Sequence, residues 1–403
     1  MFNNVNVLTK HCAAQNTEDH AAVSGEEKYA FKAEWFEPVS SMVRDFILIY
    51  FPNDNTLSLF DVKTQRTFLK RSLVENIDRQ DIYVGNTVKI FSRHIAITGY
   101  ANKFTENVVG RASQSICVII KPDGRPYMGT ILKIMLANGF KISEMRMLKL
   151  PSELVVKLFA HEMNSPDFKD FVEHMTSDPV VALELINQNA VDRMRTICGP
   201  EDPKIAKEDS PSSIRACFGT SSIQNVVHFS TADDETKLQC ELLFGRSAPV
   251  ANTATDTVLL KNSTLCIIKP HALRDGKAGE IIEMIEGEGY KITAIRMFRM
   301  NNTNAKEFLE VYRGVLPEYT EIVSEFVNGG LIAMEIVGPS KENTPSDFRT
   351  FAGPMDPDLA KKLRPNTLRA RFGLDKVRNA IHATDLPDDA PLEVEYFFRI
   401  MVL

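Results

Sequence analysis

A chain of 403 residues is long enough for two or three globular domains, and its 44% hydrophobic and 25% charged residues are typical of a soluble protein. The apolar runs fall well short of the ~18 residues that a membrane-spanning helix needs, which excludes a membrane protein and a membrane partner. The formal net charge of −6 gives no general reason to expect nucleic acid as a partner.

Residues 1–28 have no apolar segment behind a basic start, so they are not a secretory signal and are interpreted as a tail. The cysteines show neither a CxxC pair nor the histidine spacing of a zinc site, and most of them lie in apolar runs. Buried free thiols in a reducing cytosol are expected at positions 12, 117, 198, 217, 240 and 266.

Residues 29–114 are predicted to form a β-rich domain. Short apolar or alternating runs follow one another, separated by turn-forming residues such as PNDN at 52–55. The runs are FILIYFP, TLSLFDV, RTFLKR, TVKIF and HIAITGY. This pattern indicates a small sheet or barrel.

The rest of the chain contains an internal repeat: the same sequence pattern occurs twice. Arg215 and His228 stand thirteen residues apart, as do Arg369 and His382, and the stretches around them share a Phe-Gly and an Asn. Other matching segments, such as IIKPDG and IIKPHA, place two homologous domains at 115–245 (copy A) and 263–403 (copy B). Residues 246–262, rich in Ala, Thr, Ser and Asn, are predicted to be the linker between them. A duplication kept only for architecture is the alternative interpretation.

The apolar pattern of each copy predicts, in order, a strand, a helix, a strand, helices, a strand, a helix, a strand and a helix. That order is the β-α-β-β-α-β plan of the ferredoxin-like fold. The fold class is therefore α+β: an N-terminal β-rich domain followed by two tandem ferredoxin-like domains. Two copies in one chain can also pair with each other, which favours a monomeric pseudo-dimer.

The repeated residues suit phosphate chemistry. Phosphoryl transfer needs positive charge around the moving group, and each copy offers a lysine and two arginines at matching positions. A neutral imidazole is a good nucleophile when an acceptor holds one ring nitrogen, and Glu393 is placed to do so in copy B, where copy A has Gln239. Solvated surface charge is the alternative for any single cation. The sequence contains neither a P-loop nor the protein-kinase motifs.

The motifs IIKPD, GPEDP, GPMDP and R-x-x-F-G-x-x-x-x-x-N-x-x-H resemble the nucleoside diphosphate kinase family. The resemblance implies transfer of a γ-phosphate between nucleotides, with ATP or GTP and Mg²⁺, through a phosphohistidine at His228 and His382. It implies nucleotide binding by Lys121, Phe168, Arg195, Arg215, Asn225, Lys269, Tyr319, Arg349, Arg369 and Asn379. It implies supporting roles for Ser230, Thr384 and Glu393, and it assigns no protein ligand to the metal.

Both copies depart from the family pattern. The family's tyrosine near the nucleophile falls on Phe159 and Leu309, and its phosphate-binding threonine falls on Glu201 and Met355. The Asp of KPD is His271 in copy B. Loss of one phosphate donor costs ~10²–10³ in rate in comparable sites. Two unequal sites are expected, with slow self-phosphorylation in place of efficient nucleotide interconversion.

Residues 29–117 also resemble the DM10 module of ciliary, axoneme-associated proteins, with KYAFKAEWFEP, DVKTQRTFLKR and VGNTVKIFSRH as the matching stretches. This resemblance implies a fold like a pleckstrin-homology domain. It also implies the cytoskeleton as the setting: the axoneme of a cilium or flagellum, the centrosome or the basal body, with tubulin of doublet microtubules, neighbouring axonemal proteins and the γ-tubulin ring complex as partners.

The preferred hypothesis is a microtubule-associated cytoplasmic protein that retains histidine autophosphorylation. An active nucleoside diphosphate kinase is the alternative. A 3′–5′ exonuclease on single-stranded DNA ranks lowest, because no paired-carboxylate metal site is visible in the sequence.

Overall fold

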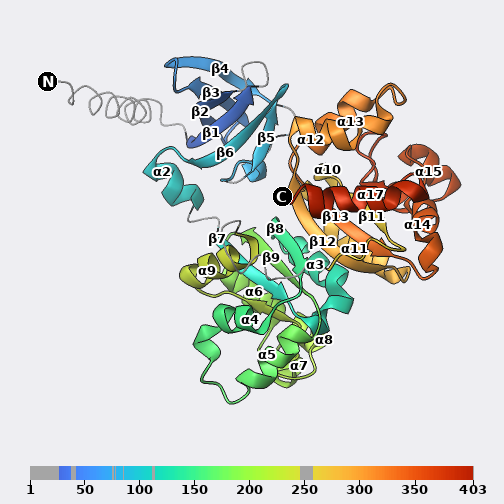
Figure 1. Cartoon of the computed structure of the whole chain (residues 1–403). Helices are drawn as coiled ribbons and strands as arrows, with labels where there is room; N and C mark the ends of the chain where they lie inside the picture. Colours follow the sequence, from blue (N-terminus) through green and yellow to red (C-terminus); the bar gives the residue numbers. More distant parts are fainter. Residues whose placement is uncertain are drawn as a thin grey trace. The chain divides into compact units, whose positions relative to one another are not determined.

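The computed structural model describes residues 27–37, 42–74, 77, 79–84, 86–110, 114–245 and 257–402. Most of the predicted tail 1–28 and of the predicted linker 246–262, together with Cys12, lies outside the described residues. The chain divides into two compact units, residues 1–112 and 113–403 (Figure 1). The limits proposed for the individual domains stay predictions.

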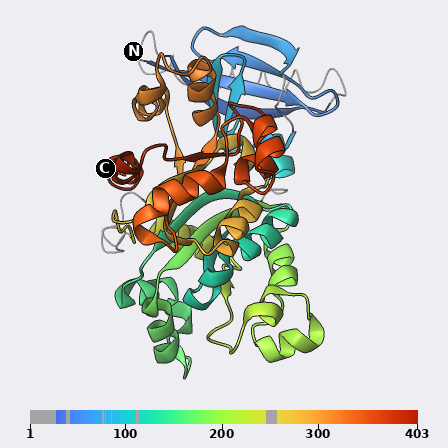
Figure 2. The ribbon, with the colours of Figure 1, turned by 90° about the vertical axis from the view of Figure 1, so that its right-hand side faces the viewer.

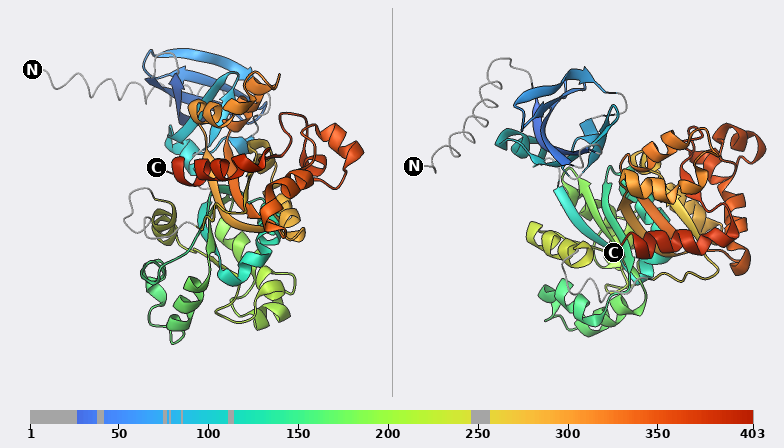
Figure 3. Two further views of the ribbon diagram at one scale, coloured as in Figure 1. Left: turned by 45° about the vertical axis from the view of Figure 1, so that its right-hand side comes forward. Right: turned by 45° about the horizontal axis from the view of Figure 1, so that its top comes forward.

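The described part of the first unit holds an antiparallel sheet of six strands in the order β4-β3-β2-β1-β6-β5. The strands are β1 (Tyr29–Glu37), β2 (Met42–Phe51), β3 (Thr56–Asp61), β4 (Arg66–Leu73), β5 (Thr87–Ile90) and β6 (Arg93–Tyr100), followed by the short helix α2 (Lys103–Thr105). Figure 3 shows this sheet curling. Alternate residues, such as Phe46, Leu48 and Tyr50 of β2, point into one core because side chains of a strand alternate between its faces. The β-rich prediction is confirmed.

In the described part of the second unit, eight strands form one sheet in the order β10-β7-β9-β8-β12-β13-β11-β14. Copy A contributes β7 (Gln114–Ile120), β8 (Lys141–Leu148), β9 (Val180–Asn187) and β10 (Val227–Phe229). Copy B contributes β11 (Thr264–Ile268), β12 (Lys291–Arg299), β13 (Gly330–Val337) and β14 (Ile381–Ala383). Within each copy the fourth strand pairs with the first and the second with the third, which is the predicted ferredoxin-like topology.

Helices cover this sheet (Figures 1 and 2). One face forms a core that runs through both copies, under α3 (Met128–Ala137), α6 (Ala190–Cys198), α11 (Ala278–Gly287) and α14 (Thr344–Ala352). The other face carries a separate core in each copy. In copy A, α4 (Ser152–Leu158), α5 (Phe168–Ser177) and α9 (Asp233–Phe244) cover it, and in copy B α12 (Asn302–Phe308), α13 (Tyr319–Phe326) and α17 (Ala390–Glu395) do so.

Shorter helices connect these elements. In copy A they are α7 (Pro203–Asp209) and α8 (Ile214–Phe218), and in copy B they are α10 (Pro270–Arg274), α15 (Pro357–Leu363) and α16 (Leu368–Phe372). No helix among the described residues is long and apolar enough to span a membrane. The described cysteines are free thiols: Cys117, Cys198 and Cys266 are buried as expected, whereas the expected burial is wrong for Cys217, which is exposed, and for Cys240, which is half-buried.

The two copies pair through equivalent elements: β8 lies beside β12, with Arg146 opposite Arg296, and α3 packs on α11. The helices approach so closely that a Cβ on Gly129 would lie 2.2 Å from the backbone N of Glu283. Glu286 of α11 accepts a hydrogen bond of 2.9 Å from the backbone N–H of Gly129. The pairing therefore places a half-buried carboxyl group between the copies.

Burial raises the pKa of Glu286 to about 7, an effect that the Gly129 N–H opposes and the neighbouring Glu283 adds to. Because this pKa is raised, the folded chain binds the proton more tightly than the unfolded chain, and stability falls as the pH rises through about 7. Glu286→Gln keeps an acceptor for Gly129 and cannot ionise. We expect this variant to be more stable than the wild type by ~1–3 kcal/mol at pH 8 and equally stable at pH 4, in chemical denaturation.

The matched control is Glu288→Gln on the same segment, where the side chain is exposed. It should change the stability by less than ~0.5 kcal/mol at either pH. The stability difference between Glu286→Gln and the wild type should be larger at pH 8 than at pH 4. An equal difference at the two pH values would show that the carboxyl group is not desolvated.

Candidate active sites

Each candidate catalytic histidine sits at the middle of a three-residue strand. His228 of β10 lies opposite Ile119 of β7, and His382 of β14 lies opposite Ile267 of β11. Antiparallel pairing to a buried central strand fixes the backbone on both sides of the imidazole. The exposed fraction of the side chain is 16% for His228 and 7% for His382.

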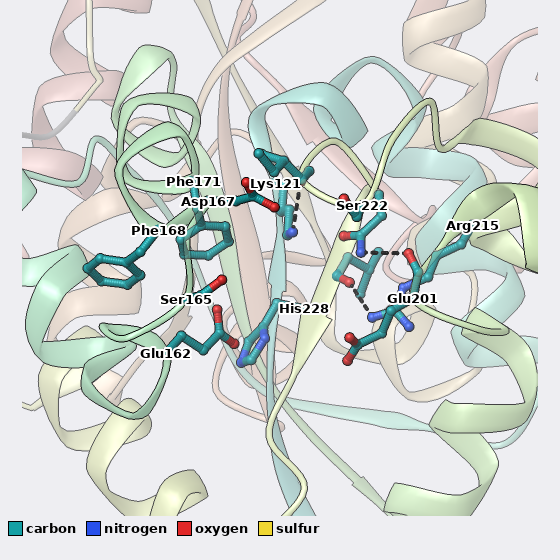
Figure 4. A pocket seen from close by; sticks show the side chains of 13 residues that line it. Lys121, Glu162, Ser165, Asp167, Phe168, Phe171, Glu201, Arg215, Ser222 and His228 are labelled. Atoms are coloured by element: carbon teal, nitrogen blue, oxygen red, sulfur yellow. Dashed lines mark hydrogen bonds between the residues drawn. The ribbon is translucent and has the colours of Figure 1, made fainter.

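His228 faces a cavity of about 150 Å³ (Figure 4). Phe168, Phe171 and Glu162 stand on one side of it, and Arg215 and Glu201 on the other. The described residues that line it are Lys121, Glu162, Ser165, Asp167, Phe168, Phe171, Glu201, Arg215, Ser222, Ile223, Asn225, Val227 and His228. The structure thus brings together five residues that the sequence singled out in copy A, namely Lys121, Phe168, Arg215, Asn225 and His228.

Lys121 is a buried cation at this cavity, with only 4% of the residue exposed. Its Nζ donates to the carbonyl of Ile223 at 3.0 Å and lies 5.0 Å from the centre of the Phe171 ring. Burial lowers the pKa of Lys121 to about 8, while the nearby Asp123 raises it. A lysine that has lost most of its water shell binds an anion strongly once one is offered.

Arg215 of α8 links two backbone segments of the site. Its Nη1 donates to the carbonyl of Gly199 and its Nη2 to the carbonyl of Val227, each at 3.0 Å. Within the described residues, Nε of Arg215 and Oδ1 of Asn225 are buried without a hydrogen-bond partner. Buried polar groups are nearly always bonded in folded proteins, so the two atoms are available to a water molecule or a polar ligand, and Asn379 Oδ1 is unpartnered in the same way in the described part of copy B.

His228 is held from behind by two residues of α9. Nε2 of Gln239 donates to Nε2 of His228 at 3.2 Å and to Oε1 of Glu235 at 3.1 Å, and Glu235 Oε1 lies 3.6 Å from the same imidazole nitrogen. Burial alone would raise the pKa of Glu235, but the neighbouring His228 imidazole and the hydrogen bond from the Thr231 N–H lower it to about 2. Copy A therefore keeps a carboxylate beside its histidine, although not at the position where the sequence comparison between copies looked for it.

Glu235 is a functional candidate that the sequence reasoning missed. It precedes Gln239 by four residues, so both side chains lie on the same face of a helix. Their i, i+4 spacing was the available signal.

The predicted supporting hydroxyls tie the histidine strands to their surroundings. Ser230 Oγ accepts the backbone N–H of Cys117 at 2.9 Å and lies 2.7 Å from Thr236 Oγ1. Thr384 accepts the N–H of Leu265 at 3.3 Å and donates to Glu393 Oε2 at 2.8 Å. Each hydroxyl lies two residues beyond its histidine and fixes the end of the strand.

His382 has the imidazole contact that the sequence predicted. Its Nε2–H donates to Oε2 of Glu393 at 2.9 Å, and the same oxygen is held by Thr384. A proton fixed on Nε2 leaves the lone pair of Nδ1 for attack. The orienting geometry in copy B is therefore better than in copy A.

The cavity of copy B is nearly closed, at about 20 Å³, which is little more than the space for one water molecule. Lys269, Arg369, Asn379 and His382 line it, together with Leu309, Tyr312, Leu316, Ile322, Phe326, Met355, Ile381 and Asp385. Tyr312 donates its hydroxyl to Asp385 Oδ2 at 2.5 Å. Burial, followed by this bond, raises the pKa of Tyr312 above its usual range. The aligned position in copy A is Glu162.

Asp385 supplies negative charge to the cations of copy B. It accepts from Arg349 through its backbone carbonyl at 2.7 Å, and its carboxylate lies 3.4 Å from Arg349 Nη2. Burial lowers the pKa of Arg369, and Asp385 opposes that effect. Lys269 is 3% exposed, and burial lowers its pKa to about 7.

The structure does not bring the other three predicted nucleotide-binding residues to the cavities that the described residues form. Arg195 is exposed and pairs with Asp192 at 3.3 Å on its own helix. Arg349 is exposed too, and contacts the copy B cavity only through Asp385. Tyr319 packs against the core of copy B. Their roles stay predictions.

The residues of copy A fit a nucleotide that carries Mg²⁺. Lys121 and Arg215 are suited to phosphate oxygens, Phe168 offers a ring face, and Asn225 has an unused acceptor for a sugar hydroxyl. Magnesium is commonly held by substrate phosphates plus one or two carboxylates, and Glu162 and Glu201 supply these at the cavity. Among the described residues no group of three or more His, Cys, Asp or Glu is arranged to hold a metal alone.

Removing the Tyr312 ring should open copy B. In a Lys121→Met background, where copy A has lost a phosphate-binding cation, we expect Tyr312→Ala to gain binding of inorganic tripolyphosphate through Lys269 and Arg369. The expected readout is a rise of a few °C in Tm at a ligand concentration of ~100 Kd.

The control is Val311→Ala in the same background, an exposed neighbour of Tyr312. It should show no rise in Tm with the same ligand. Equal shifts in the two variants would mean that Tyr312 does not close the site.

The family described as nucleoside diphosphate kinase matches this chain at residues 114–248 and again at 262–401. Nucleoside diphosphate kinase homolog 7 of Rattus norvegicus is 39% identical over 93% of this chain and 94% of its own length. The Mus musculus homolog 7 is 38% identical over the same shares. A nucleoside diphosphate kinase of Aquifex aeolicus is 38% identical over 34% of this chain and 92% of its own length. The chain therefore belongs to the nucleoside diphosphate kinase family.

Proposed function

We propose that copy A binds a nucleoside triphosphate and accepts its terminal phosphoryl group on His228, while copy B serves as a closed partner domain. The observation that carries the proposal is the open polar cavity in which Lys121, Arg215 and His228 meet. The same three positions in copy B line a cavity of only about 20 Å³, together with Tyr312 and Asp385. A triphosphate has room in the first site only.

Binding rests on the two buried cations. The phosphate oxygens take the place of the water that Lys121 and Arg215 have lost, and a dry site strengthens these charge interactions. When a nucleotide is bound, its Mg²⁺ neutralises part of the phosphate charge. Phe168 is placed at the cavity wall to stack against the base.

In the transfer, the imidazole proton of His228 first moves from Nδ1 to Nε2, which lies 3.6 Å from the carboxylate of Glu235, and the freed lone pair of Nδ1 attacks the terminal phosphorus. A bond forms from Nδ1 to phosphorus, the bond from phosphorus to the bridging oxygen breaks, and the nucleoside diphosphate leaves with that electron pair. The imidazole gains positive charge, which the carboxylate of Glu235 offsets at 3.6 Å. Reversal of the same steps with another nucleoside diphosphate completes a ping-pong exchange.

Gln239 makes this site slow. Its amide N–H donates to Nε2 of His228, which keeps the imidazole proton on Nδ1, the nitrogen that must attack. His382 shows the opposite arrangement, because Glu393 accepts from Nε2–H. Copy A therefore has the open cavity and the less favourable tautomer, which supports autophosphorylation over rapid nucleotide interconversion.

Moving the carboxylate to position 239 should accelerate labelling. The double variant Glu235→Gln with Gln239→Glu keeps one carboxylate and one amide on α9 and reproduces the Glu393 geometry. In single-turnover labelling with γ-labelled ATP, we expect acid-labile label on the wild type and a rate on the order of tenfold higher in the double variant.

His228→Asn should abolish the label, whereas His382→Asn should leave it. No label on the intact protein, or label that survives in His228→Asn, would contradict the proposal. An active nucleoside diphosphate kinase is the alternative, and it would instead show rapid transfer to a second nucleoside diphosphate in the wild type.

We further propose that the protein acts in a microtubule setting: in the axoneme of a cilium or flagellum, the centrosome or the basal body, near tubulin and the γ-tubulin ring complex. The support is the resemblance of residues 29–117 to a module of axonemal proteins, and the six-stranded sheet described there is compatible with it. Single-stranded DNA exonuclease stays the lowest-ranked alternative.

Co-sedimentation tests this setting. The full chain should pellet with polymerised tubulin at tubulin concentrations on the order of 10 μM, and it should remain in the supernatant without tubulin. His228→Asn should pellet to the same extent, because the association does not depend on the phosphoryl transfer. A chain that stays in the supernatant across this range would count against the microtubule proposal.

A further inference from the structure

A strained turn precedes the candidate catalytic histidine in both copies. Val226 and Ala380, each two residues before the histidine, have positive φ angles of 75° and 71°. The N–H of Val227 donates to the carbonyl of Asn225 at 2.8 Å, and Ile381 makes the same bond to Asn379 at 2.9 Å, so each turn is a γ-turn. A positive φ is unfavourable for residues with a Cβ, so the surrounding structure must hold these turns.

In copy A a carboxylate holds the turn. Asp123 Oδ2 accepts the backbone N–H of Val226 at 2.9 Å, and the N–H of Lys121 donates to the Val226 carbonyl at 2.8 Å. The other carboxylate oxygen, Asp123 Oδ1, accepts from Nε2 of His174 at 2.8 Å. His174 lies on α5, and its side chain is 10% exposed. Asp123 thus connects the turn at Val226 to helix α5.

In copy B an imidazole holds the turn. The N–H of Ala380 donates to Nε2 of His271 at 3.2 Å, and the N–H of Lys269 donates to the Ala380 carbonyl at 2.9 Å. Since Nε2 of His271 accepts, its Nδ1 carries the proton and donates to Glu325 Oε1 at 2.8 Å. Glu325 lies on α13, the counterpart of α5, and is 6% exposed.

The two connections are the same pair with its members exchanged. The loop residue is an acid and the helix residue an imidazole in copy A, and the reverse holds in copy B. In both, the loop residue accepts the N–H of the strained turn; the pair is buried in copy B and half-buried in copy A. His271, which the sequence presented as the loss of an aspartate, is therefore one half of a compensated exchange.

We propose that His174 and Glu325 are positioning residues, and that either orientation of this acid–imidazole pair holds the turn that aims the catalytic histidine. Neither residue lines the cavities. They act through Asp123 and His271 on the backbone of Val226 and Ala380.

The orientation of the pair also sets where the negative charge lies relative to the phosphate-binding lysine. In copy A the carboxylate is on residue 123, two residues from Lys121. Burial lowers the pKa of Lys121, Asp123 raises it, Arg215 lowers it, and Glu162 and Glu201 raise it. In copy B burial and Arg369 lower the pKa of Lys269, and Glu325 and Asp375 raise it. The lysine pKa is about 8 in copy A, where Glu162 and Glu201 add to the effect of Asp123, and about 7 in copy B.

The test exchanges the acid and the imidazole of the pair in copy A, using the full chain with Asp123→His and His174→Glu. Asp123→His alone places two imidazoles together, and His174→Glu alone places two carboxylates together. Each single variant should slow labelling of His228 by γ-labelled ATP ~10-fold or more, and the double variant should recover to within ~3-fold of the wild type. Glu173→Gln, an exposed neighbour of His174, is the matched control and should label as the wild type does.

A second readout separates positioning from general stability. In the double variant the pH above which binding of a non-hydrolysable ATP analogue weakens should move to lower pH, because the carboxylate has left the position next to Lys121. The single variants test whether the pair holds the turn, whereas the pH shift tests whether its carboxylate acts on Lys121. A purely structural pair would restore stability in the double variant without moving the pH profile.

The labelling arm depends on the proposed phosphorylation of His228, while the binding and stability arms do not. In one outcome the wild type takes no label, while the double variant recovers the binding that the single variants lose and shifts its pH profile. That result would contradict the proposed phosphoryl transfer and support the proposed role of the acid–imidazole pair. A double variant no better in binding and stability than the two single changes combined would overturn the inference.

Discussion

Two buried cations beside one histidine are the constraint from which the rest of the site follows. A lysine and an arginine withdrawn from water need compensation from carbonyl groups, a ring face or an anion. Both copies supply the carbonyls and the ring, through Ile223 and Phe171 in copy A and Val377 and Phe326 in copy B. The anions differ between the copies: Asp385 acts on Arg369 in copy B, whereas Asp123, Glu162 and Glu201 act on Lys121 in copy A.

The two copies differ in the size of the cavity and in how the histidine is oriented. Copy B keeps a well-oriented imidazole, bonded to Glu393, inside a site that Tyr312 has closed. Copy A keeps the open cavity, but Gln239 and Glu235 hold its histidine less directly. The shared sheet and the α3–α11 contact join the two copies as one folded unit.

Repetition made much of this predictable from the sequence. Lys121, Arg215, Asn225 and His228 recur in both copies, the last three with identical spacing, and they meet at one cavity because the same topology is built twice. Glu235 was missed because it has moved one helical turn from the expected position. The exchange of Asp123 and His174 was missed because it joins segments that only the tertiary fold brings together. The closure by Tyr312 depends on a side-chain contact with Asp385, which no local pattern encodes.

The stoichiometry of nucleotide binding tests the central claim most directly. Calorimetric titration of the full chain with a non-hydrolysable ATP analogue and Mg²⁺ should give one site per chain, lost in Lys121→Met and retained in Lys269→Met. Two equivalent sites, or a single site that disappears only in Lys269→Met, would contradict the assignment of copy A as the open site and copy B as the closed one.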